Sequence, residues 1–244
     1  MSAARAAGPL TNAAPFPDRR ERLVRPLLAA FLAVSAADLV AVLAGSGLAH
    51  LVAKPLLMPL LAGYAAARRG PRPLIAALLC GWVGDTFLLA DADAAFLIGM
   101  GGFAAGHLCY LRLFGRARSA LLPAILYAVV LAAFLALIRG GLPAGLRLPL
   151  AGYSLLLTAM AYRSRVLGRC AAAGGALFLL SDALIATGIA DRPQLPAPDF
   201  WVMLTYVAAQ LLLTLGALGP GARRPGARRP GAGPGAYRGR RTGI

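Results

Sequence analysis

The 244-residue sequence has few charged residues and very few acids. Charged residues make up 14% of the chain, against about 25% in a soluble globular domain. Its three cysteines, Cys80, Cys109 and Cys170, are an odd number without metal-ligand spacing, so we interpret them as small apolar residues. The sequence also lacks a Gly-x-Ser-x-Gly elbow, a nucleotide-binding glycine loop and a metal-ligand cluster. These gaps disfavour serine-hydrolase, ATP-driven and metal-dependent chemistry, and no cofactor or metal is expected.

Apolar residues are abundant instead, at 59% of the chain, and the mean hydropathy is +0.70. They occur in blocks of about 18–22 residues, the length that spans a hydrocarbon core of about 30 Å at about 1.5 Å per residue. We therefore predict an all-α fold, a polytopic membrane protein with a bundle of eight transmembrane helices and short loops. The predicted spans are 26–44, 50–67, 73–90, 94–113, 120–138, 145–162, 168–190 and 198–218.

The net charge of +16 is distributed unevenly over the loops. Arginines cluster in the N-terminal leader, after the second, fourth and sixth spans, and in the C-terminal tail. The alternate loops hold the acids Asp91, Asp93, Asp191 and Asp199. This is the positive-inside pattern, which predicts that both termini are cytoplasmic. We expect a multi-pass protein of a cell membrane, the cytoplasmic membrane of a bacterium, with anionic lipid headgroups at the arginine clusters and no nucleic-acid partner.

Two segments lie outside the predicted transmembrane domain, 26–218. Residues 1–25 form a basic leader that we predict to be cytoplasmic and disordered. Residues 219–244 form a tail that repeats the motif GARRP and contains Gly and Pro throughout. A segment of this composition cannot bury a core, so the tail is also expected to be disordered.

Five ionisable side chains interrupt the apolar spans: Asp38, Lys54, Asp85, His107 and Asp182. An ionisable group at membrane depth costs about 2.5–3.5 kcal/mol on insertion scales, so it normally faces the bundle interior and marks a site. Counted along the predicted helices, the three acids and the lysine lie in one layer about 6–12 Å below the outer surface, with the histidine deeper. We predict that these groups line one cavity that opens outward.

The role of each ionisable group stays open between packing and function. Asp38 and Lys54 are either a buried ion pair that fixes helix packing or part of a functional site. His107 is either a hydrogen-bonded packing residue or a participant. Because one lysine cannot neutralise three acids, at least one carboxyl group is expected to hold a proton near neutrality. Asp85 and Asp182 are therefore the candidate pair for general acid–base chemistry.

A parallel repeat of four helices plus four is also indicated. Asp85 and Asp182 occupy the third helix of each half, and each follows a small residue. The fourth helix of each half has an aromatic residue and, four positions later, a polar one: Phe103 and His107, then Tyr206 and Gln210. Such a repeat would bring the two acids face to face across a pseudo-two-fold axis.

Five segments of the sequence match one family in order. They are AKPLLMPLLAG, GDTFLLA, FLIGMGGFAAGHLCYL, GALFLLSDALIA and YVAAQLL, on the second, third, fourth, seventh and eighth predicted helices. Together they resemble the YhhN-like family, whose animal members are lysoplasmalogenases, over about residues 26–218. The resemblance implies an eight-helix membrane hydrolase that cleaves the vinyl-ether bond of a lysoplasmalogen and releases a fatty aldehyde.

The resemblance also implies roles for particular residues. The paired aspartates of the family match Asp85 and Asp182, which are expected to act as catalytic acid and base in either order. Supporting or substrate-binding roles are implied for Lys54, His107, Tyr110, Tyr206 and Gln210. Asp38, which the resemblance does not match, is added as a supporting candidate because it is an acid within a span. The expected substrate is a lysophospholipid that enters from the bilayer. The main alternative is a proton-coupled transporter of small molecules or lipids that uses the intramembrane acids as protonation sites. A lipid-binding protein without turnover is a third reading.

Overall fold

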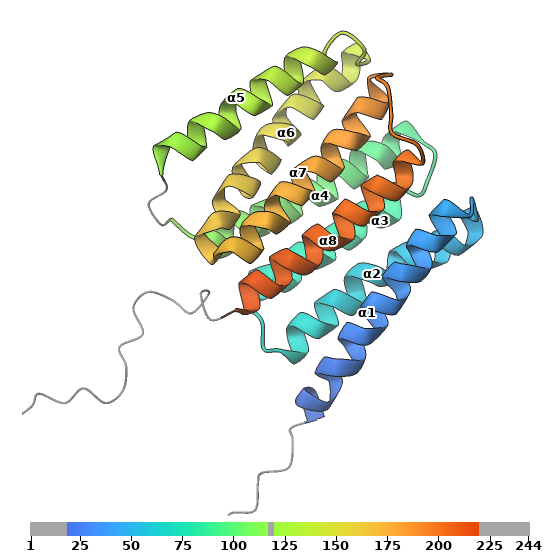
Figure 1. The fold of residues 1–244 in the computed structure, drawn as a ribbon, viewed down its shortest axis with the longest axis vertical. Helices are drawn as coiled ribbons and strands as arrows, with labels where there is room; N and C mark the ends of the chain where they lie inside the picture. The colour runs from blue at the N-terminus through green and yellow to red at the C-terminus, as the bar shows by residue number, and fades with distance from the viewer. Residues whose placement is uncertain (1–18, 117–119, 220–244) are drawn as a thin grey trace, which may run out of the picture.

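The computed structural model describes residues 19–116 and 120–219, and these fold into α-helices with no strand among them. The helices are α1 (Arg19–Leu43), α2 (Gly47–Ala67), α3 (Arg72–Phe87), α4 (Asp93–Phe114), α5 (Leu121–Ile138), α6 (Ala144–Ser164), α7 (Arg169–Ile189) and α8 (Pro198–Leu218), with a short 3-10 helix at Arg165–Leu167. Figure 1 shows them as one bundle. The predicted all-α bundle is confirmed.

Seven of the described helices are long and apolar enough to cross a membrane, and the chain is a multi-pass membrane protein. The exception is α3, which has 16 residues and ends at Phe87 rather than at 90. Leu88, Leu89 and Ala90 are apolar but form a turn, in which Leu89 and Ala90 donate backbone hydrogen bonds three residues back. The prediction from apolar composition was therefore too long for this helix at its C-terminal end. Helix α3 nevertheless packs along both α2 and α4.

The first helix is longer than predicted. It begins at Arg19 rather than at 26, because arginine and glutamate are good helix formers and a helix can extend beyond its apolar part. The rest of the predicted leader and nearly all of the predicted tail lie outside the described residues.

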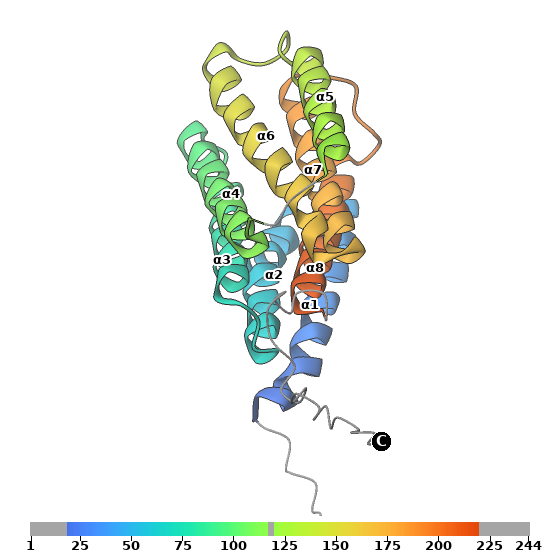
Figure 2. The same cartoon turned by 90° about the vertical axis from the view of Figure 1, so that its left-hand side faces the viewer.

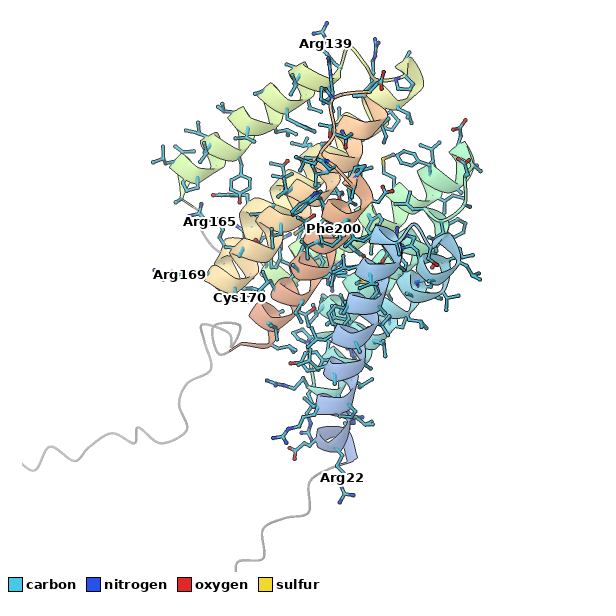
Figure 3. All side chains as sticks on the ribbon, turned by 45° about the vertical axis from the view of Figure 1, so that its right-hand side comes forward. Arg22, Arg139, Arg165, Arg169, Cys170 and Phe200 are labelled. Atoms are coloured by element: carbon cyan, nitrogen blue, oxygen red, sulfur yellow. The ribbon has the colours of Figure 1, made fainter. Side chains whose placement is uncertain are left out.

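Consecutive helices run in opposite directions, so their connections gather at two ends of the bundle (Figures 1 and 2). We call one the arginine-rich end; it has the start of α1 and the α2–α3 and α6–α7 connections. Arg22, Arg165 and Arg169 lie at this end, and Arg139 lies at the opposite end (Figure 3). We call the other the acidic end; it has the α3–α4 and α7–α8 connections, with Asp91 and Asp191. Which face of the membrane each end occupies stays a prediction.

The helix pairs α3–α4 and α7–α8 pack most closely, and glycine allows their approach. A Cβ atom on Gly102 of α4 would lie 2.9 Å from the backbone nitrogen of Gly84 on α3. A Cβ atom on Gly174 of α7 would lie 2.7 Å from the backbone nitrogen of Leu213 on α8. Contact between backbones at this distance requires small residues, as is usual between membrane helices.

Helix α5 lies at the edge of the bundle. Only 6% of its apolar stretch is buried, against 56% for α8, and α5 packs mainly on α6. An apolar helix that exposes most of its side chains is stable when lipid surrounds it. The side of the bundle that carries α5 therefore faces the bilayer.

Candidate active site

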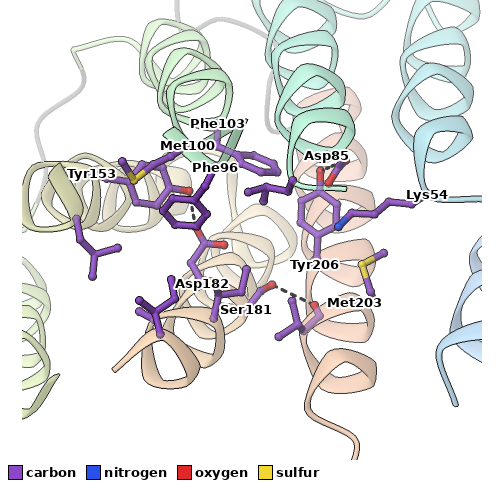
Figure 4. A pocket seen from close by; sticks show the side chains of 16 residues that line it. Lys54, Asp85, Phe96, Met100, Phe103, Tyr153, Ser181, Asp182, Met203 and Tyr206 are labelled. Carbon is purple, nitrogen blue, oxygen red and sulfur yellow. Dashed lines mark hydrogen bonds between the residues drawn. The ribbon is translucent and has the colours of Figure 1, made fainter. Parts of the chain in front are cut away.

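A cavity lies inside the bundle near the acidic end (Figure 4). Its walls come from α2, α3, α4, α6, α7 and α8 and surround about 600 Å³ of free space, counting the part that opens outward. Most of the lining is apolar, and the polar lining side chains are Lys54, Asp85, Tyr153, Ser181, Asp182 and Tyr206. Two of the predicted acids and the predicted lysine therefore share one cavity.

Asp85 is held by side chains of α8. Its side chain is 2% exposed, and Oδ2 accepts a 2.7 Å hydrogen bond from the hydroxyl group of Tyr206. That hydroxyl group accepts from Nε2 of Gln210 at 3.4 Å, and Oε1 of Gln210 accepts from the Tyr110 hydroxyl at 2.7 Å. The predicted residues Tyr110, Gln210 and Tyr206 thus form one chain of hydrogen bonds that ends on Asp85, although only Tyr206 lines the cavity.

Asp182 is held by Tyr153 of α6, which is absent from the residues predicted from sequence. The Tyr153 hydroxyl donates to Oδ2 of Asp182 and lies 3.1 Å from Nε2 of His107. Because the Tyr153 hydroxyl uses its one proton in the hydrogen bond to Asp182, it can only accept from His107. We therefore assign a proton to Nε2 of His107, which donates to the Tyr153 hydroxyl. The sequence did contain a signal for Tyr153, which is a tyrosine next to Ser154 within an apolar span. A tyrosine hydroxyl in such a span usually needs a hydrogen-bond partner, and this need could have marked Tyr153 as a site residue.

The two carboxyl groups have the same kind of support. Each accepts from a tyrosine hydroxyl, and each tyrosine accepts from an N–H donor of a second side chain, Gln210 or His107. Phe178 connects the two groups, because its ring centroid lies 5.5 Å from that of Tyr206 and 4.9 Å from that of His107. Both contacts are edge-to-face, which is a favoured aromatic geometry. The four-plus-four repeat stays a prediction.

Lys54 is the basic residue among the described residues that line the cavity. It lines the cavity, and Figure 4 shows its ammonium group directed toward Tyr206 and Asp85. Lys54 thus lies in the same cavity as both carboxyl groups, with its charge directed toward that of Asp85. Lys54 itself forms no hydrogen bond or ion pair within the described part of the chain.

Asp38 lies outside the cavity lining, and the ion pair with Lys54 that the sequence allowed is not formed. Oδ1 of Asp38 lies 2.8 Å from Nδ1 of His50 instead. The reason is the register of the α1–α2 hairpin, because His50 lies one helical turn nearer the connecting loop than Lys54. Asp38 is fully buried, and its Oδ2 has no hydrogen-bond partner among the described residues.

Comparison with known proteins finds one matching family and several related proteins. A sequence model of the YhhN family matches residues 49–217. Human lysoplasmalogenase TMEM86B is 42% identical over 138 residues, which are 56% of this chain and 59% of the human protein. Rat lysoplasmalogenase TMEM86B is 41% identical over 138 residues, 56% of this chain and 57% of the rat protein. The matches thus span less than two thirds of these relatives. No solved structure matches.

Proposed function

The chain belongs to the YhhN family, and we propose that it is a lysoplasmalogenase-like membrane hydrolase. It cleaves the vinyl-ether bond of a lysoplasmalogen or a related single-chain lipid and releases a fatty aldehyde, the activity class that the names of its relatives indicate. The observation that carries this proposal is the shared cavity, in which the buried carboxyl group of Asp85 and the partly buried one of Asp182 face one largely apolar space. Asp85 and Asp182 are the proposed catalytic residues.

Vinyl-ether hydrolysis needs an acid and an anion in the same site. A proton must reach the β-carbon of the double bond, which leaves an oxocarbenium ion that water then captures. A protonated acid in an apolar site supplies the proton, and a carboxylate stabilises the cation and activates the water. A pair of carboxyl groups in different charge states can do both.

The position of Lys54 supports one assignment of these roles. Its ammonium group is directed toward Asp85 in the shared cavity, and a nearby positive charge favours a carboxylate, so we assign the anion to Asp85. Asp182 accepts a hydrogen bond from the uncharged hydroxyl of Tyr153, so we assign the acid to Asp182. In this assignment Lys54 acts by setting the charge of Asp85; the alternative is that it binds the substrate phosphate.

The reaction then balances in three steps. Asp182 transfers its proton to the β-carbon, whose double-bond electrons form the new C–H bond. Water bonds to the α-carbon of the oxocarbenium ion and gives a proton to Asp85. The resulting hemiacetal returns its hydroxyl proton to Asp182, its C–O bond to the glycerol breaks, and the leaving oxygen takes the proton from Asp85. One water molecule is consumed, and both carboxyl groups regain their starting states.

The tyrosines and their partners position the carboxyl groups. Tyr153 and Tyr206 hold Asp182 and Asp85 at the cavity. His107 and Gln210 keep these tyrosine hydroxyls oriented, and Tyr110 acts through Gln210. We also propose that anionic headgroups contact the arginine-rich end and that this end faces the cytoplasm of a bacterium.

The test is aldehyde release by the purified protein in detergent micelles supplied with a lysoplasmalogen. The wild type is expected to release aldehyde, and both Asp85→Asn and Asp182→Asn are expected to abolish the release. A wild-type protein that is inactive on every vinyl-ether lipid, yet carries a proton-dependent flux in liposomes, would overturn the proposal and indicate a transporter.

A further inference from the structure

A second hollow lies between α5, α6 and α7, on the far side of Tyr153 and Asp182 from the first. It contains about 790 Å³ of free space. The two spaces share Leu150, Tyr153, Asp182 and Ala186 as lining residues. They therefore meet at the hydrogen-bonded pair of Tyr153 and Asp182. We call this second space the α5 groove.

The α5 groove is apolar and opens toward the bilayer. Helix α5 contributes Val130, Leu131 and Phe134 to it, and α5 is the helix with the least buried apolar stretch. Among the described residues that line the groove, Asp182 is the one acidic or basic residue, and it lies where the groove meets the cavity. An apolar space of this kind, at membrane depth and at the side of the bundle, suits a hydrocarbon ligand.

The groove runs along the helices from the cavity toward the arginine-rich end. On α6 its lining residues extend from Leu150 to Thr158, a stretch of about 12 Å. On α7 they extend from Ala186 back to Ala176, in the same direction because α6 and α7 are antiparallel. The groove is thus parallel to the direction in which a lipid chain lies in a leaflet.

Another hollow next to the cavity is more polar than the α5 groove. A hollow at the acidic end has about 1420 Å³ of free space and shares Leu88, Phe96 and Ile189 with the cavity. Its lining includes Asp91 and Asp93. A hydrocarbon chain placed there would desolvate these acids, which is costly. The cavity therefore has an exit with two acids at the acidic end and a largely apolar exit at the side.

We propose that the α5 groove binds the aliphatic chain of a single-chain lipid, whose headgroup points to the acidic end. The chain then lies toward the membrane centre and the headgroup toward one surface, as in a leaflet. This proposal rests on the proposed function and extends it, because it sets the direction of the substrate. The β-carbon, which bears the chain, lies beside Asp182, and the ether oxygen lies toward Asp85 and Lys54.

Photocrosslinking tests the groove without turnover. The probe is a lysophospholipid with a saturated 1-O-alkyl chain, which the proposed reaction cannot cleave, and a diazirine at the chain end. With the full chain in nanodiscs, adducts are expected on Val130, Leu131 and Ala176 and are expected to disappear with excess unlabelled lysolipid. Adducts that resist competition, or that lie on α1 and α2, would overturn the proposal. So would crosslinks between α5 helices of two copies, since a second copy would then cover the groove.

A matched pair of variants tests the groove by chain length. Ala176 and Ala173 are both exposed on α7, and only Ala176 lines the groove. Ala176→Phe is expected to lower kcat/KM about tenfold for a hexadecenyl substrate and to leave a butenyl analogue unchanged. Ala173→Phe is expected to change neither. An equal loss on both substrates by Ala176→Phe would contradict the proposal.

The two experiments separate this proposal from the proposed function. Competed adducts in the groove without aldehyde release from any vinyl ether would refute the hydrolase and retain the chain-binding site. Aldehyde release with adducts elsewhere would refute the chain-binding site and retain the hydrolase.

Discussion

The hydroxyl group of Tyr206 donates a 2.7 Å hydrogen bond to the carboxylate of Asp85, across 121 residues of sequence. The two residues belong to α8 and α3, and therefore to the two helix pairs that pack most closely. A single contact thus ties the packing of the bundle to the position of one carboxyl group. A shift of α3 relative to α8 moves that group within the cavity.

Neutral amides in place of the carboxyl groups test the proposed catalytic pair. Asp85→Asn and Asp182→Asn each preserve the size of the side chain and remove its acid–base function. General acid–base catalysis contributes about 100-fold to 10,000-fold, so each variant is expected to lose at least about 100-fold in kcat. The measurement is aldehyde release at saturating substrate. Asp199→Asn, at an exposed acid in the first turn of α8, is the control and is expected to retain full activity.

Tyr153→Phe tests the residue that sequence alone did not predict. The variant removes the donor to Asp182 and leaves Nε2 of the buried His107 without its partner. An unpaired buried polar group costs about 1–3 kcal/mol of stability, so we expect a lower melting temperature. Because the proposed acid Asp182 loses the donor that holds it, we also expect a loss of about 10-fold or more in kcat. Tyr162→Phe on the same helix removes a hydrogen bond to the backbone of Ala120 and is the matched control. Equal activities of the two variants would exclude a positioning role for Tyr153.

Variants of Lys54 distinguish its two possible roles, which are control of the charge of Asp85 and binding of the substrate phosphate. If Lys54 sets the charge of Asp85, Lys54→Met is expected to lower kcat about tenfold or more with little change in KM, while Lys54→Arg retains most of the activity. The measurement is steady-state aldehyde release with a lysoplasmalogen and with the same chain on glycerol without phosphate. A rise in KM seen only with the phosphorylated substrate would show instead that Lys54 binds the phosphate.

Adjacent glycines on α4 test the close packing of α3 and α4. A Cβ atom on Gly102 would lie 2.9 Å from the backbone nitrogen of Gly84, which cannot move as a side chain can, whereas a Cβ atom on Gly101 meets nothing within 4 Å. Gly102→Ala is therefore expected to lower the melting temperature in detergent. Gly101→Ala is expected to leave it unchanged or raise it, because alanine is favoured over glycine in helices by about 1 kcal/mol. The reverse order of melting temperatures would show that these helices are not held in this register.

Asp38 is expected to act on stability rather than on turnover. A hydrogen bond contributes about 0.5–1.5 kcal/mol to stability, and the fully buried Asp38 makes one with the partly exposed His50 while lying outside the cavity lining. Asp38→Ala is therefore expected to lower the melting temperature and to leave the kcat of the folded protein within about threefold. A loss of kcat as large as that of Asp85→Asn, at an unchanged melting temperature, would place Asp38 in the catalytic machinery.

The sequence by itself determined the eight helices and the membrane environment. Each apolar block is a local property, because the transfer free energy of a segment depends on its own residues. The same local reasoning identified the charged residues within these blocks. It misjudged the end of α3, because Leu88, Leu89 and Ala90 are equally apolar in a helix and in a turn.

Only the tertiary structure decided which polar groups meet. Tyr153 reaches Asp182 across the α6–α7 contact, and Asp38 pairs with His50 rather than with Lys54. These partners depend on the order of the helices around the bundle, on the rotation of each helix and on its register with its neighbours. Hydropathy fixes none of these three quantities, because it is the same for every rotation of a helix. They follow from side-chain packing between segments that are far apart in the chain.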